Sequence, residues 1–75
     1  MQYEKKLYII DSLKQARQII RHVKAFISQA VLAVRNEEIE HAEVLAERAI
    51  SHLEELARLL DELEREAKGG GPHDK

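Results

Sequence analysis

The sequence predicts an all-α fold, an antiparallel two-helix hairpin that is expected to dimerise into a four-helix bundle. Three features support this prediction: apolar residues recur every three or four positions from Ile9 to Ala67, the spacing breaks once after Val34, and each apolar stripe has a second apolar flank beside it. Such a stripe lies along one side of a helix and requires a partner. Charged residues form 35% of the 75 positions, which favours long solvated helices over strands.

The first predicted helix spans about residues 4–35. Its start is ambiguous, because Tyr3, Lys5, Leu7 and Ile9 also alternate as in a short strand. A lone strand would find no partner in this chain, so we expect a helix from about residue 3 or 4. From there neither Gly nor Pro interrupts a stripe that alternates between heptad positions d and a: Ile9, Leu13, Ala16, Ile20, Val23, Ile27, Ala30 and Val34.

The join between the helices is predicted at about Asn36. The step from Val34 to Ile39 is five residues, which turns the stripe by roughly a quarter turn on a helix of about 3.6 residues per turn. One continuous helix would therefore carry two stripes that face different ways. Asn36 tolerates the left-handed conformation at a helix end and is a good N-cap for the next helix. We therefore expect two helices joined by a turn.

The second predicted helix spans about residues 37–68. Lys68 lies in its last turn, and Gly69 and Pro72 then oppose continuation, so residues 69–75 are expected to form a flexible tail. Its stripe runs through four heptads and alternates between positions a and d: Ile39, Ala42, Ala46, Ala49, Leu53, Leu56, Leu60, Leu63 and Ala67.

The flanks of the two stripes indicate how the helices meet. Positions b and e are basic in the first helix and acidic in the second, and like flanks face each other in an antiparallel pair. We therefore expect the hairpin to close along the charged flanks, with contacts such as Arg21 with Glu54 and Lys14 with Asp61. The apolar g flanks would stay open for a second copy or for a helix of an unrelated protein. The expected dimer interface consists of Ile19, Phe26, Leu45, His52 and Leu59.

The charge distribution offers an alternative function. Residues 1–35 hold seven Lys and Arg against two acids, whereas residues 36–68 hold four against eleven. We expect the acidic helix to neutralise the basic one, but a basic helix can also track phosphates. The architecture resembles small dimeric helical-hairpin RNA-binding proteins of the Rop type in topology and length. That resemblance implies RNA binding, and the basic stripe of the first helix would then form the nucleic-acid face with Lys14, Arg17, Arg21 and Lys24.

Other motifs give weaker signals. Apolar residues outside the stripes could form a patch for a protein partner, composed of Val31, Leu32 and Val44. Glu38 and His41 have the E-x-x-H spacing of carboxylate-bridged di-iron bundles, but facing carboxylates near the turn are lacking, so we expect no metal site.

The composition narrows the classes of function. Cysteine is absent, and no nucleophile arrangement or glycine-rich loop between a strand and a helix is present. The longest apolar run, at residues 30–34, is far shorter than the roughly 20 residues of a membrane span. We therefore expect a cytoplasmic, non-enzymatic protein interaction or scaffold module, without cofactor, that self-assembles through an apolar helical face.

Overall fold

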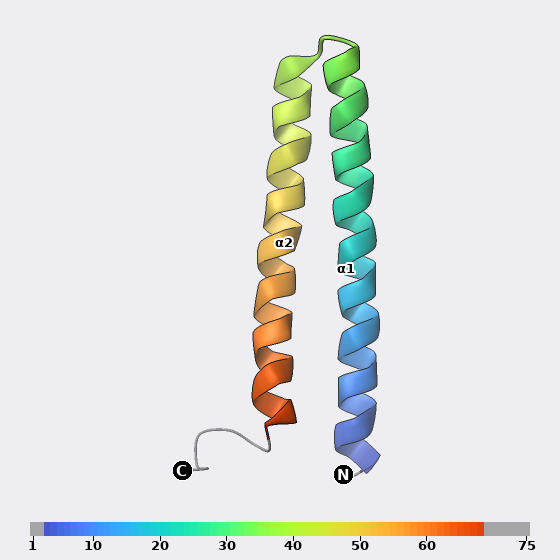
Figure 1. Ribbon diagram of the computed structural model, residues 1–75, viewed down its shortest axis with the longest axis vertical. Helices are drawn as coiled ribbons and strands as arrows, with labels where there is room; N and C mark the ends of the chain where they lie inside the picture. Colours follow the sequence, from blue (N-terminus) through green and yellow to red (C-terminus); the bar gives the residue numbers. More distant parts are fainter. Residues whose placement is uncertain (1–2, 69–75) are drawn as a thin grey trace.

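The computed structural model describes residues 3–68, which form two long antiparallel helices. Helix α1 spans Tyr3–Arg35 and helix α2 spans Ile39–Ala67. The molecule is one helix layer thick, and the start of α1 lies beside the end of α2, opposite the turn (Figure 1). The prediction of an all-α two-helix hairpin is confirmed. The tail expected at residues 69–75 lies outside the described residues.

Charges at the helix ends match the helix dipoles. Glu4 lies in the first turn of α1 and Arg35 in its last turn, while Glu40 and Arg65 hold the corresponding places in α2. Acidic groups near an N-terminus and basic groups near a C-terminus stabilise a helix, because they oppose the partial charges there. The charged residues at the ends of α1 and α2 therefore stabilise both helices.

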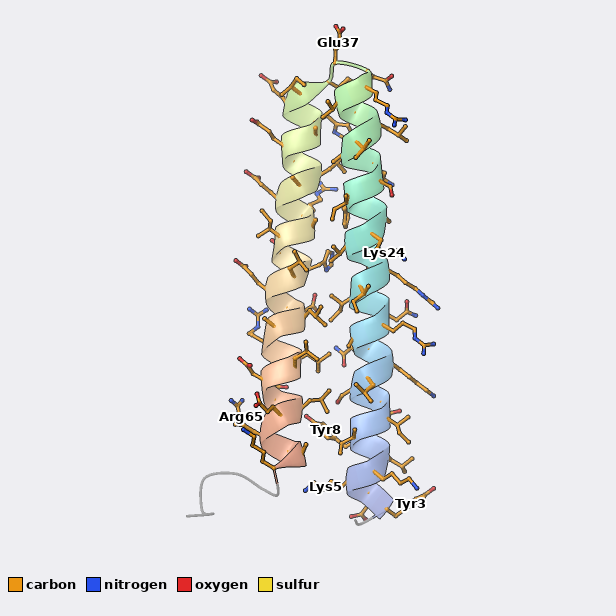
Figure 2. All side chains as sticks on the ribbon, in the orientation of Figure 1. Tyr3, Lys5, Tyr8, Lys24, Glu37 and Arg65 are labelled. Atoms are coloured by element: carbon orange, nitrogen blue, oxygen red, sulfur yellow. The ribbon has the colours of Figure 1, made fainter. Side chains whose placement is uncertain are left out.

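The turn between the helices is a Schellman motif. The amide of Glu38 donates to the carbonyl of Ala33 at 2.8 Å, and the amide of Glu37 donates to the carbonyl of Val34 at 2.9 Å. Glu37 adopts the left-handed conformation, with φ of 62°, and its side chain projects beyond the end of the hairpin (Figure 2). These bonds satisfy carbonyls that the helix end would otherwise leave unpaired.

The structure corrects the predicted role of Asn36. The left-handed residue is Glu37, and the N-cap of α2 is Glu38, which forms no side-chain capping hydrogen bond. Helix α1 continues to Arg35, so the position after the helix cap, where a Schellman motif requires positive φ, falls at residue 37. Asn36 therefore closes the last turn of α1, and α2 begins two residues later than predicted.

Replacing Glu37 with glycine is expected to stabilise the hairpin by about 1 kcal/mol. A side chain with a Cβ pays a steric cost in the left-handed region that glycine avoids. Urea denaturation at a fixed protein concentration measures the change. Glu38→Gly is the matched control, because φ of Glu38 is −99° and glycine relieves no strain there. Equal stabilities of the two variants would contradict the strain at Glu37.

The hairpin closes through heptad positions d and g of both helices. Helix α2 contributes Leu45 and Leu63 to this interior, and α1 contributes Ile19 and Val23, all between 3% and 8% exposed. Small residues fill the other buried positions and let the helices approach closely: Ser12, Ala16, Ala33, Ala42 and Ala49. Near the turn, Phe26 and Ala30 pack against the cluster of Ala33, Ala42 and Leu45.

The prediction that the hairpin closes along its charged flanks is therefore wrong. Closure there would place Arg17 and Lys24 in the interface, where charges lose hydration. Closure through the g flanks instead removes Ile19 and Leu45 from water, which contributes roughly 1.5–3 kcal/mol per large side chain. An exposed ion pair adds only about 0–1 kcal/mol. The hairpin therefore closes through its apolar g flanks and leaves the charged flanks exposed.

Candidate functional site

The candidate functional site is an apolar surface that runs along both helices on one side of the hairpin. We call it the open face. It consists of the large side chains at heptad position a, each between 45% and 54% exposed: Leu13, Ile20, Ile27, Val34, Ile39, Leu53 and Leu60. These residues belong to the predicted seam, but only its d positions are inside the hairpin. A single chain leaves the other half in contact with water.

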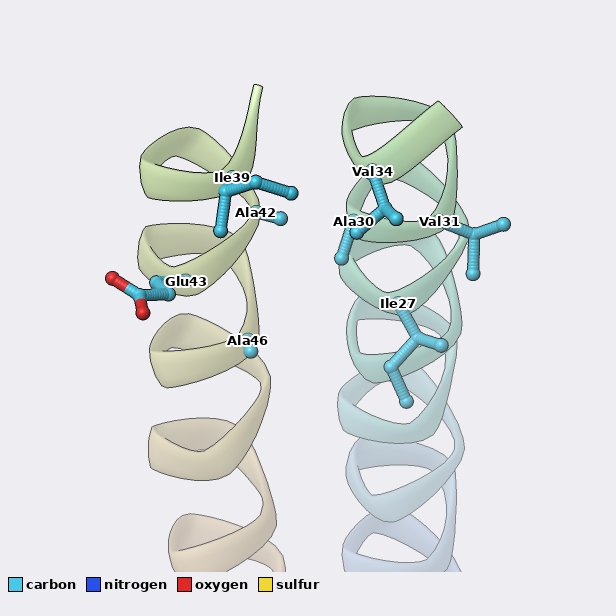
Figure 3. A pocket seen from close by; sticks show the side chains of 8 residues that line it. All are labelled: Ile27, Ala30, Val31, Val34, Ile39, Ala42, Glu43 and Ala46. Atoms are coloured by element: carbon cyan, nitrogen blue, oxygen red, sulfur yellow. The ribbon is translucent and has the colours of Figure 1, made fainter. Parts of the chain in front are cut away.

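The open face deepens into a groove of about 380 Å³ at the turn end. Its walls come from both helices, and Figure 3 shows Val31 at the outer edge on α1 and Glu43 at the outer edge on α2, pointing away from each other. Small side chains make the groove hollow, because alanine fills little of the space between the walls. The lining residues are Ile27, Ala30, Val31, Val34, Ile39, Ala42, Glu43 and Ala46.

Two charged margins border the open face. The basic margin on α1 consists of the exposed residues Lys14, Arg17, Arg21 and Lys24, and the acidic margin on α2 consists of the exposed residues Glu43, Glu47, Glu54 and Asp61. Within residues 3–68, the close contacts between basic and acidic side chains are those of His52 with Glu55 and of Lys68 with Glu64, both inside the α2 segment or its cap. The expected pairs of Arg21 with Glu54 and of Lys14 with Asp61 do not form within this part of the chain.

The predicted dimer interface lies inside the hairpin. Ile19 is 4% exposed and Leu45 is 3% exposed, so neither can form an open strip. Phe26, His52 and Leu59 are half-buried in the same interior. The expectation of an exposed g flank is therefore wrong, because α1 and α2 use that flank against each other.

The predicted protein patch is divided between two surfaces. Val31, Leu32 and Val44 are all exposed, at 47%, 55% and 44%. Val31 lines the groove, whereas Leu32 and Val44 are at position f, outside the groove lining. Val31 therefore belongs with the open face, and the other two residues are separate exposed side chains.

The other side of the hairpin carries a small aromatic cluster. The ring of His52 stacks on Phe26 at a centroid distance of 5.6 Å and lies 5.3 Å from the ring of His22. The Nδ1 atom of His52 is 3.2 Å from Oε1 of Glu55. No group of three or more His, Cys, Asp or Glu side chains in residues 3–68 is placed to hold a metal ion, and His41 in the E-x-x-H motif is exposed.

Sequence reasoning missed the open face because it treated positions a and d as equivalent. The signal that separates them is side-chain size. Position d carries alanine at Ala16, Ala30, Ala42 and Ala49, which allows close helix approach. Position a keeps larger side chains over most of both helices, and these are too bulky for the same tight interface.

A comparison with protein-family models, with curated proteins and with solved structures finds no match for this chain. Neither α1 nor α2 is apolar enough over a sufficient length to cross a membrane. The proposed function therefore rests on the geometry of the open face.

Proposed function

We propose that this protein is a non-enzymatic interaction module that self-assembles, through the open face, into a homodimeric four-helix bundle. The observation that carries the proposal is the continuous surface of seven large apolar side chains, all about half exposed, on one side of a two-helix layer. Large contiguous apolar surfaces on soluble proteins mark interaction sites. A second copy supplies a surface of matching length and chemistry.

The balance between buried and exposed side chains supports this proposal. Within residues 3–68 the buried apolar residues number eight, and four of them are alanine, whereas fifteen large apolar side chains are more than a third exposed. A core of this kind gives a small domain little stability. Packing two hairpins face to face would add a second apolar interface and produce the common four-helix arrangement.

Native mass spectrometry of the purified protein tests the proposal. The expected result is a mass twice that of the 8.6 kDa chain at micromolar concentration. A chain that stays monomeric up to millimolar concentration would exclude self-assembly. A complex with an unrelated protein and no dimer would assign the open face to a different occupant.

Nucleic-acid binding is the second candidate, and the exposure of the basic margin favours it. Phosphate binding by Lys14, Arg17, Arg21 and Lys24 should weaken about a hundredfold between about 50 mM and about 200 mM salt, because four phosphate contacts are lost to counterion competition. Titration of a fluorescent RNA at two salt concentrations measures this dependence. Apolar self-assembly does not weaken in this way, because added salt does not oppose apolar burial.

A further inference from the structure

The two margins of the open face carry opposite charges, and this asymmetry distinguishes the possible orientations of a second copy. The basic margin follows α1 and the acidic margin follows α2, on the outer sides of the same apolar surface. Glu43 is an example of the acidic margin, because it lines the groove and points outward from α2 (Figure 3). A partner that covers the open face therefore brings its own two margins into contact with these.

A symmetric dimer of hairpins packed face to face has two arrangements. With the twofold axis parallel to the helices, both turns lie at the same end and α1 of each copy covers α2 of the other. With the axis perpendicular to the helices, the turns lie at opposite ends. Helix α1 then covers α1 of the other copy, and α2 covers α2 of the other copy. Both are closed and use the same apolar surface on both partners. Apolar burial therefore does not distinguish the two arrangements, whereas the contacts between the charged margins do.

The same-end arrangement brings opposite charges together. His22 lies beside His52 in the hairpin, and counting along the two antiparallel helices from this pair puts Arg21 level with Leu53, one residue from Glu54. The same count puts Lys14 level with Leu60, one residue from Asp61. When α1 covers the partner's α2 at the same height, Lys14 and Arg21 each lie within one residue of a carboxylate, whereas Arg17 and Lys24 lie level with Ala57 and Ile50. The opposite-end arrangement instead sets lysine and arginine against arginine and lysine, and carboxylates against carboxylates.

The groove is also compatible with the same-end arrangement. Counting from His22 and His52 puts Ile27 of one copy near the height of the partner's Ala46, in the hollow part of the groove. A large side chain then meets a small one, which is how packed helix layers fill space.

We propose that the second copy packs with its turn at the same end, so that α1 of each protomer covers α2 of the other. This inference rests on the proposed self-assembly and adds the orientation of the partner. Lys14 and Arg21 of one protomer then pair with the partner's Asp61 and Glu54. These are the same pairs that the sequence predicts within one hairpin, but here they form between the two protomers.

Distance measurement between two spin labels at the turn tests the orientation. The chain contains no cysteine, so Asn36→Cys provides one label per protomer at an exposed site. The same-end dimer gives a short separation, because packed helix axes lie about 8–10 Å apart. A separation near the 53 Å length of the molecule would overturn the orientation but keep the dimer. Loss of dipolar coupling together with a monomeric mass would overturn self-assembly itself.

Charge reversal gives an independent test with opposite signs for the two arrangements. Lys14→Glu with Arg21→Glu is expected to raise the dimer dissociation constant at least about tenfold, because four attractive contacts become repulsive. Adding Glu54→Lys and Asp61→Lys should restore the original value. The opposite-end arrangement predicts tighter dimerisation for the first variant, because Arg17 and Lys24 would then meet carboxylates. Far-UV circular dichroism checks that each variant keeps its helices.

Discussion

Replacing Leu45 with alanine is expected to destabilise the hairpin by about 2–5 kcal/mol. Leu45 is 3% exposed and belongs to the cluster with Ala33 and Ala42, where little can move to fill the space that the side chain leaves. A core of this size rarely gives more than about 3–5 kcal/mol, so the variant should be largely unfolded at room temperature. Urea denaturation followed by circular dichroism measures the loss.

The control for this prediction is Leu32→Ala. Leu32 is 55% exposed, so the same chemical change should alter the free energy of unfolding by no more than about 0.5 kcal/mol. Both variants are compared at one protein concentration, because dimerisation couples stability to concentration. Similar effects at the two sites would contradict closure through the g flanks.

Replacing Ile20 and Ile27 together with glutamate is expected to raise the dimer dissociation constant by about a thousandfold. The two side chains are 45% and 49% exposed in the hairpin, so covering the remainder is worth about 1 kcal/mol each. A symmetric dimer loses four such contributions, which amounts to about 4 kcal/mol. Burying four carboxylates adds to the cost. Sedimentation equilibrium measures the constant, and circular dichroism measures the helix content.

The matched control is Leu32→Glu with Val44→Glu. These residues are at position f, outside the groove lining, yet their exposure, at 55% and 44%, is similar to that of the open-face residues. The control should dimerise like the unchanged chain. A dimer that survives the Ile20 and Ile27 replacements, or one lost equally in the control, would show that the open face is not the assembly surface. Loss of a protein partner only in the control would support the patch predicted at Leu32 and Val44.

The two helices and the position of their join follow from local patterns, which is why the sequence predicts them. The spacing from Ile9 to Val34 and from Ile39 to Ala67 indicates helices, and the change of phase between Val34 and Ile39 excludes a single long one. The structure has the break at this place, with α1 ending at Arg35 and α2 beginning at Ile39.

The choice of flank was harder to predict, because it depends on a comparison between two interfaces. Charge complementarity between Arg21 and Glu54 suggested one closure, and the apolar flank with Ile19 and Leu45 suggested another. Inside one chain the apolar flank prevails, since an exposed ion pair contributes less than burial of a large apolar side chain. The charges remain at the margins of the open face, where a second copy can use them.

The turn residue shows a further limit of local reasoning. Asn36 has the side chain that commonly occupies the left-handed position, yet Glu37 adopts it. The position after the helix cap is set by where α1 ends, and α1 ends where its interior side chains still meet those of α2. Packing of Ala33 against Ala42 and Leu45 therefore outweighs the local preference of asparagine.

The most direct test of self-assembly through the open face is an isotope-filtered nuclear Overhauser experiment on a mixture of labelled and unlabelled chains. Only contacts between copies give signals in this measurement. We expect cross-peaks from the methyl groups of Ile20 and Ile27 to those of the partner's Leu53 and Ala46. Cross-peaks confined to Ile19 and Leu45, or none at a concentration where the dimer is populated, would contradict it.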